Sequence, residues 1–250
     1  MHPLSVRRSA SVVATLVLAV GIGCPPCANA QSTAEPGMFQ LYVGGGGGAS
    51  PMTLDSRDYS ATGHFVTQIN GTTHTITQDE TFAGSYKGFV GLRFLEYFGI
   101  EAGVGHLGTV GFTAEGVGGS GGGAYAFTDR GDYSAGMTYV AGLLTLPTGD
   151  DGGYFHLKGG TAQVKVDVTE TFTQEFLLSG LTVDSVFKTT SKVTRPLIGL
   201  GYTTSVGTGK QLRVELEYLG EIGKPYMFGS QDGTGRASVT MLTIAYMFVF

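Results

Sequence analysis

The carboxyl terminus constrains the fold of this chain more than any other segment. Residues 238–250 read S-V-T-M-L-T-I-A-Y-M-F-V-F, and from Leu242 to Phe250 every second side chain is large and apolar. Successive side chains of a β-strand point to opposite faces, so the segment predicts a strand with one continuous apolar face. In a membrane barrel that face meets acyl chains, and its aromatic residues lie near the headgroups. We therefore expect the chain to end as a strand of a bacterial outer-membrane barrel.

The amino terminus has the pattern of a secretory signal peptide. Arg7 and Arg8 precede an apolar run from Ser11 to Gly23, and Ala28-Asn29-Ala30 is a small-residue cleavage pattern. The alternative is a transmembrane helix, but the run holds only about 13 residues, whereas spanning a bilayer takes roughly 20. We expect residues 1–30 to be removed and residues 31–250 to form the mature protein.

Both cysteines of the chain belong to this leader. Cys24 and Cys27 form a C-P-P-C motif ahead of the expected cleavage site, so the mature chain has no cysteine. Lipidation of Cys24 is the alternative, but Gly21-Ile22-Gly23 lacks the leucine-like residue expected three positions before a lipidated cysteine. We expect no disulfide, no thiolate metal site and no cofactor.

Composition favours a single all-β domain over residues 31–250. Glycine accounts for 42 of the 250 residues, charged residues for only 14%, and no segment shows a sustained helical period with caps. Removal of Arg7 and Arg8 leaves 13 basic residues against 20 acidic ones, a net charge near −7. Nucleic acid is therefore not an expected partner, because binding it requires basic residues at its phosphates.

Alternating hydrophobicity predicts eight strands. The expected turns after the second, fourth and sixth strands are short, whereas the other connections are long, as in outer-membrane barrels with short periplasmic turns. Ten strands are the alternative if residues 72–76 and 172–183 join the barrel wall, although these segments fit better as strands above the membrane or as loop hairpins. The eight expected strands cover residues 38–45, 82–94, 98–108, 134–146, 154–168, 193–206, 211–220 and 238–250.

One strand–turn–strand segment carries a family resemblance. Residues 86–103, Y-K-G-F-V-G-L-R-F-L-E-Y-F-G-I-E-A-G, resemble the small eight-stranded porin-like barrels related to the transmembrane domain of outer membrane protein A. The resemblance implies a barrel in the outer membrane, in contact with lipid and lipopolysaccharide. It also implies that the barrel-assembly machinery reads a terminal aromatic signal, here Tyr246, Phe248 and Phe250. The chain departs from the family in its glycine runs, and we expect no periplasmic domain after its last strand.

Charged side chains fall on the less apolar face of the predicted strands, which is the face expected to line the lumen. On the lipid face a lysine or arginine at the midplane costs about 2–4 kcal/mol. An eight-stranded barrel is only wide enough for side chains to fill it, so we expect an interlocked plug. The alternative is a narrow porin-like channel for ions or small solutes. The predicted network comprises Lys87, Arg93, Glu101, Lys158, Arg195, Arg213, Glu215 and Glu217.

Catalysis is not expected, and a lipid-modifying enzyme is the less favoured alternative. The mature histidines are His64, His74, His106 and His156, and none has a serine two residues on, so the H-x-S pattern of lipid A deacylase barrels is absent. Hydrolysis would need a nucleophile with a base in reach. These histidines are interpreted as surface or lumen polar residues.

Two further features concern the connections between strands. The run Gly44–Gly48 lacks the G-K-[ST] ending of a phosphate-binding loop, and it is interpreted, with Gly118–Gly123, as flexible loop or strand-end backbone. The long connections carry apolar residues that can anchor a partner. Adhesion to a host or surface partner is therefore a further hypothesis, beside a structural role.

Overall fold

The computed structural model describes residues 39–55, 73–94, 96–119, 123–148, 153–225 and 233–250, which form nine antiparallel strands. The expected signal peptide lies outside these residues. His64, one of the four histidines of the mature chain, also lies outside them. The strands are β1 (Phe39–Leu54), β2 (Thr73–Gln78), β3 (Phe82–Phe94), β4 (Phe98–Gly118), β5 (Tyr125–Pro147), β6 (Tyr154–Phe176), β7 (Thr182–Gly207), β8 (Lys210–Lys224) and β9 (Gly235–Val249).

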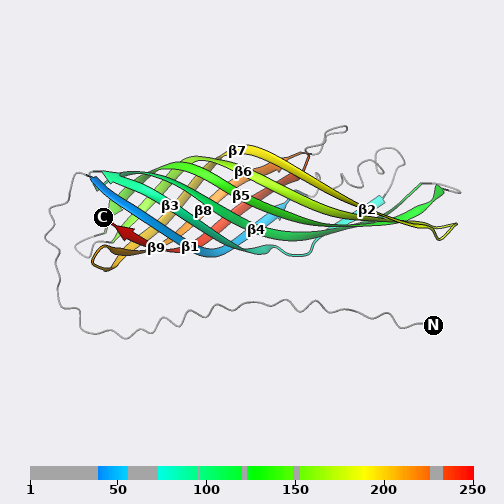
Figure 1. Ribbon diagram of the computed structural model, residues 1–250, viewed down its shortest axis with the longest axis horizontal. Helices are drawn as coiled ribbons and strands as arrows, with labels where there is room; N and C mark the ends of the chain where they lie inside the picture. Colours follow the sequence, from blue (N-terminus) through cyan, green and yellow to red (C-terminus); the bar gives the residue numbers. More distant parts are fainter. Residues whose placement is uncertain (1–38, 56–72, 95, 120–122, 149–152, 226–232) are drawn as a thin grey trace, which may run out of the picture. The chain divides into compact units, whose positions relative to one another are not determined.

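Eight of these strands close into a barrel, as expected from the sequence. Each pairs antiparallel with its neighbours in the order β4-β3-β1-β9-β8-β7-β6-β5, and pairing of β5 with β4 completes the ring (Figure 1). The closing seam joins the first and last strands, with Tyr42 opposite Val249 and Leu54 opposite Ala237. Closure leaves no sheet edge in the membrane, where unpaired backbone groups have no water to bind.

The wall strands begin where the sequence predicts at the short-turn end, but most run much farther at the other end. The ladder between β5 and β6 continues from Pro147 opposite Tyr154 to Tyr125 opposite Phe176. That between β6 and β7 extends as far as Glu175 opposite Thr182. Long connections expected between the strands are therefore largely strand themselves, and β4–β7 form an extension beyond the rest of the barrel (Figure 1).

The short strand β2 shows how the ninth strand fits this arrangement. It pairs with the outer part of β4, from Thr73 opposite Val117 to Gln78 opposite Phe112. The same edge of β4 pairs with β3 nearer the short-turn end. Its ladder therefore lies in the extension and adds no strand to the ring. The interpretation of residues 72–76 as strand outside the wall is confirmed for the described residues 73–76, and the ten-strand alternative is wrong.

The expectation that Gly44–Gly48 forms flexible loop or strand-end backbone is wrong, because all five glycines lie within β1. A Cβ on Gly44 would come within 2.7 Å of the Phe89 ring and 2.8 Å of Met247. On Gly46 it would overlap the backbone of Ile244 and Ala245 on β9. The glycines let β1 lie close to β9 and give the ring of Phe89 room inside the narrow barrel, as expected for a tightly curved sheet.

The outer wall carries a band of exposed apolar side chains. On β6 the outward positions Phe155 and Leu157 are more than half exposed, whereas the outward positions farther along the strand are Gln163 and Lys165. This change marks the end of the lipid-facing band after about 10 residues, the length of a transmembrane β-strand. No helix among the described residues is long and apolar enough to cross a membrane.

Candidate functional site

Six of the eight predicted interior residues meet in one buried cluster. They are three cations (Lys87, Lys158 and Arg213) and three anions (Glu101, Glu215 and Glu217), each at most 3% exposed. The inward positions of β3, β4, β6 and β8 supply them, so strands distant in sequence place their charges at one level of the lumen. The formal charges of the six sum to zero.

Glu101 is the most connected member of the cluster. Its carboxylate accepts hydrogen bonds from Lys158 Nζ at 2.6 Å and from the Arg213 guanidinium. It also accepts from the hydroxyls of Tyr139 at 2.7 Å and Tyr42 at 3.1 Å. Four donors from four strands therefore satisfy one carboxylate in a space from which water is excluded. Such pairing is the condition for keeping a charge buried.

The second half of the cluster is built on β8. Lys87 forms ion pairs with both Glu215 and Glu217. Lys158 lies between the two halves, because its Nζ is 2.8 Å from Glu217 and 3.6 Å from Glu215 as well as bonded to Glu101. Gly199 on β7 leaves room here, since a Cβ there would lie 3.1 Å from the side chain of Glu217. The ions form a single continuous network.

Two predicted members lie apart from this network. Arg93, at the short-turn end of β3, donates to the side chain of Gln40 and stacks 4.6 Å from the ring of Tyr154. Arg195 donates from Nε to the backbone carbonyl of Glu221 at 2.8 Å, where the β8 ladder shifts register. Both residues occupy inward positions of their strands, but they lie at other heights along the barrel axis than the cluster. The alternation of the sequence predicts the face of a residue and not its height.

Three residues of the site were not predicted as members. Tyr42 and Tyr139 bond Glu101, and His156 donates through Nε2 to Glu215 at 3.0 Å. The ring of Tyr139 also lies 4.2 Å from Lys158 Nζ, an approach that favours the cation electrostatically. Their inward position was readable from the two-residue period. An aromatic residue at an inward position, facing a charged lumen, is the signal that would have predicted the two tyrosines as members of the network.

Beyond the charges, the lumen is filled by apolar side chains. On β6 the inward positions Ala162, Val164, Val166 and Val168 are all at most 2% exposed. They belong to a contiguous core that includes side chains from the other wall strands (Met52, Leu107, Val110, Met137, Leu197, Leu219 and Met241). Along the barrel axis a charged section is therefore followed by a packed apolar one.

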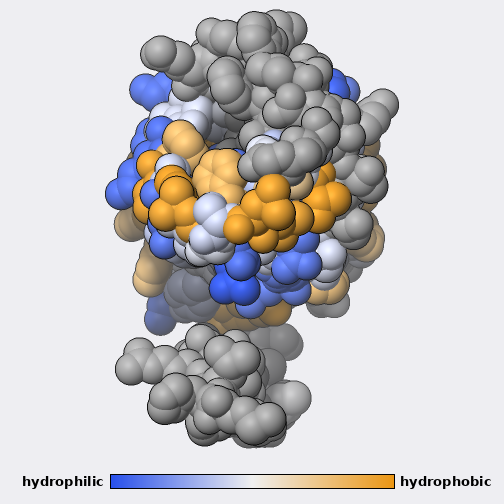
Figure 2. Space-filling model, turned by 90° about the vertical axis from the view of Figure 1, so that its right-hand side faces the viewer, coloured by the Kyte–Doolittle hydropathy of each residue, from blue (hydrophilic) through white to orange (hydrophobic). Residues whose placement is uncertain are grey.

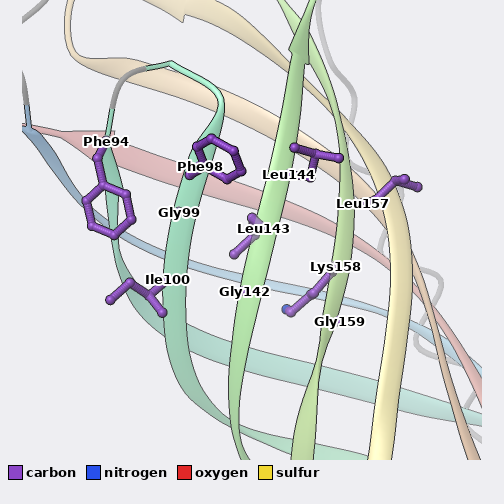
Figure 3. A pocket seen from close by; sticks show the side chains of 10 residues that line it. All are labelled: Phe94, Phe98, Gly99, Ile100, Gly142, Leu143, Leu144, Leu157, Lys158 and Gly159. Atoms are coloured by element: carbon purple, nitrogen blue, oxygen red, sulfur yellow. The ribbon is translucent and has the colours of Figure 1, made fainter.

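A hollow in the wall opens outward. It has a volume of about 680 Å³ and lies over β4, β5 and β6, where Gly142 and Gly159 are opposite each other and leave the surface bare (Figure 3). Phe98, Leu144 and Leu157 form its sides. These side chains belong to the lipid-facing band, so the hollow fits an acyl chain. It offers no charged side chain for chemistry, since Lys158 points into the lumen cluster.

The aromatic residues expected to serve as an assembly signal face outward on the last strand. Tyr246 and Phe248 are 40% and 47% exposed, and their rings meet edge to face at 5.2 Å. Phe250 is 74% exposed, and its backbone N–H donates to Leu41 at 2.9 Å, which pairs the end of the chain with β1. Recognition by the assembly machinery stays a prediction.

The described residues contain no group of three or more His, Cys, Asp and Glu side chains arranged to hold a metal ion. His156 belongs to the charge cluster, and His106 packs against the ring of Tyr86 at 5.3 Å on the outer wall. Each of these two thus has a structural contact.

Solved barrels are similar to the described structure. The attachment invasion locus protein Ail of Yersinia pestis has a TM-score of 0.43 at 9% identity, with 85% of this chain and 99% of that chain covered. For OprG of Pseudomonas aeruginosa the values are 0.41, 12%, 85% and 95%. For the N-terminal β-barrel domain of OprF of Pseudomonas aeruginosa they are 0.38, 11%, 85% and 98%.

Comparison with curated protein sequences gives no match. The family model of the OmpA-like transmembrane domain matches residues 38–249, which is most of the chain and the whole of the barrel. The resemblance seen in residues 86–103 therefore extends over the complete set of wall strands. This protein belongs to the OmpA-like transmembrane domain family and is a β-barrel of the bacterial outer membrane.

Proposed function

We propose that this protein is a closed, non-conducting barrel with a structural or surface-interaction role, anchoring the β4–β7 extension outside the outer membrane. The observation that carries the proposal is the filling of the lumen. An ion entering from the short-turn end meets six charged side chains already in contact with one another, and then an apolar core.

The energetics of the cluster support a plug over a path. Each charge is already paired with a partner from another strand, so a passing ion would have to separate pairs whose disruption costs about 3–5 kcal/mol. The apolar section offers the ion no replacement for its hydration shell, unlike the carbonyl or charged rings of selective pores. The proposal assigns no catalytic step, and the interior charges act as ties between strands.

The extension is the part of the molecule available for a surface role. Its ladders between β5 and β6 and between β6 and β7 continue beyond the lipid-facing band by more than ten residue pairs. A strand pair of this length is held by backbone hydrogen bonds, so it can present side chains at a fixed height. Connections of outer-membrane barrels at the end opposite the short turns face the exterior.

Conductance tests the proposal directly. We expect residues 31–250, refolded into a planar bilayer, to pass no steady current. Glu101→Ala removes the most connected carboxylate, and Glu115→Ala, at an exposed position of the extension, is the matched control. Insertion is verified by heat-dependent electrophoretic mobility and by protection from added protease. Steady current in the wild type that Glu101→Ala alters and Glu115→Ala does not would mean that the lumen is a path and overturn the proposal.

A further inference from the structure

The end of the β6–β7 hairpin exposes large apolar side chains far from the lipid-facing band. Leu177, Leu178 and Leu181 are 56%, 74% and 58% exposed, and Val186 and Phe187 behind them are 63% and 47% exposed. Figure 2, which looks at this end of the molecule, shows apolar surface gathered there with hydrophilic surface around it. Soluble surfaces rarely collect this many exposed apolar groups without a partner.

The turn of this hairpin has no charged side chain. From Phe176 to Val183 the sequence F-L-L-S-G-L-T-V contains no charged side chain. The described part of the neighbouring β4–β5 hairpin, residues 116–119 and 123–128, has none either, and its Val117 is 55% exposed. Two hairpin ends therefore form one uncharged tip, which we define by these residues and call the apolar tip.

Four backbone N–H groups of the apolar tip are bonded within the protein. Phe176 N donates to Leu181 O and Gly180 N donates to Phe176 O, at 2.9 and 2.8 Å. Leu177 N donates to Ala124 O at 2.9 Å, which joins the two hairpins, and Leu181 N donates to Ser179 Oγ at 3.3 Å. Transfer of a backbone into lipid is costly chiefly through unsatisfied N–H and C=O groups. The bonds of these four N–H groups lower that cost for the turn.

The lipid layer that holds the barrel is not the partner of the apolar tip. The tip begins about 12 residues beyond Lys165 on β6, roughly 40 Å along the strand at about 3.3 Å per residue, which is a height of about 30 Å at a strand tilt of about 40°. Lys165 itself lies past the lipid-facing band and is paired with Asp167 at 2.7 Å. The tip therefore stands well outside the headgroups of its own membrane.

We propose that the apolar tip inserts into the outer surface of an apposed membrane with electrically neutral headgroups, which names the partner in the surface role proposed above. The leucines project from a turn, a convex shape that fits a deformable lipid surface. Glu175 and Asp184 flank the uncharged stretch, and each would be repelled by anionic headgroups. The nearest lysine of the hairpin, Lys188, lies four residues behind Asp184. Because the acidic residues lie nearer the tip than the lysine does, binding to zwitterionic lipid is favoured over binding to anionic lipid.

Flotation with protein-free vesicles tests the inference. The mature chain is placed in lipid nanodiscs, so the barrel is embedded and the tip is free, and phosphatidylcholine vesicles are added. We expect the nanodiscs to float with the vesicles. The triple variant Leu177→Ser, Leu178→Ser and Leu181→Ser should lower the partition coefficient by about tenfold or more, because three apolar groups are removed. The matched triple methionine variant should keep it within about threefold.

A spectroscopic signal locates the tip in the lipid. The chain contains no tryptophan, so Leu178→Trp introduces a single indole. Its emission should shift to the blue when phosphatidylcholine vesicles are added and should be quenched by lipids with brominated acyl chains. Heat-dependent mobility confirms that each variant is folded before it is compared.

Three results would overturn the inference: wild-type nanodiscs that do not float, serine and methionine variants that float equally, or stronger flotation with vesicles containing phosphatidylglycerol. Absence of flotation together with binding to a purified surface protein would assign the tip to a protein pocket. The proposed function is tested separately. A barrel that passes no steady current and does not float with the vesicles contradicts only the present inference. A barrel that conducts and floats contradicts only the proposal of a closed lumen.

Discussion

Replacing Glu101 by glutamine is the most direct perturbation of the interior cluster. The substitution keeps the shape of the side chain and removes one negative charge, which leaves the six-ion cluster with a net positive charge. In the wild-type protein the Glu101 carboxylate accepts hydrogen bonds from Lys158, Arg213, Tyr42 and Tyr139. An amide has one oxygen to accept with, and its NH₂ group would face donors. Two buried cations are therefore left with a weakened partner.

The magnitude follows from the burial of those cations. Removing one partner of a buried ion pair costs about 3–5 kcal/mol, because the remaining charge stays desolvated. With a urea dependence of about 2 kcal/mol/M, the unfolding midpoint should fall by about 2 M. The control is Glu175→Gln, at the edge of the extension, where the expected change is within about 0.5 kcal/mol.

The assay is urea unfolding of the mature chain from lipid vesicles, followed by tyrosine fluorescence and by heat-dependent mobility. Glu101→Gln combined with Lys158→Met restores the charge balance. We expect the double variant to lose less stability than the two single variants summed, as contacting residues do in a double-mutant cycle. An unchanged midpoint for Glu101→Gln, or strict additivity in the cycle, would refute the network as a source of stability.

Three other expectations follow from contacts of the wall. Gly91→Ala should destabilise the barrel by about 1–3 kcal/mol in urea unfolding, since its Cβ would overlap the Tyr42 ring, whereas Gly84→Ala, with open space around its Cβ, should be neutral. Arg195→Gln should change stability by less than about 1 kcal/mol, because the residue lies apart from the ion network; a larger loss would show that it belongs there. Deletion of Phe250 should lower the yield of inserted protein in cells, measured by heat-dependent mobility of membrane fractions, and normal yield would show that assembly does not need this residue.

The fold was predictable from the sequence because the two-residue alternation of side chains identifies each strand and also shows which of its faces meets lipid and which meets the lumen. The ends near the short turns were accurate: Phe94 and Phe98 flank the first turn as expected, and Tyr154 begins β6. Most far ends were not, because beyond the lipid-facing band the apolar alternation stops while the backbone ladder continues. The strand predicted over residues 154–168 ends where the inward apolar positions give way to Glu170, but β6 continues to Phe176.

The site was predictable in its chemistry and only partly in its geometry. Alternation identifies which charges point inward, but not how far along the axis each strand places them. Glu101 and Lys158 meet because the register of β4, β5 and β6 brings them to one level, and register is set by pairing along the whole wall. The glycines of β1 were misinterpreted for a related reason. Their role depends on Phe89 and Met247, which no local pattern associates with them.

The distribution of the charges over the strands has a consequence for how the barrel enters the membrane. Lys87, Glu101, Lys158 and Arg213 come from four strands, and no two of those strands adjoin except β3 and β4. A sheet that entered the bilayer open would turn lysines and arginines toward acyl chains, at about 2–4 kcal/mol each near the midplane. The neutral state exists only when β3, β4, β6 and β8 have come together. We expect the curling of the sheet and its passage into lipid to be one concerted event, with the ion pairs forming as the ring shuts.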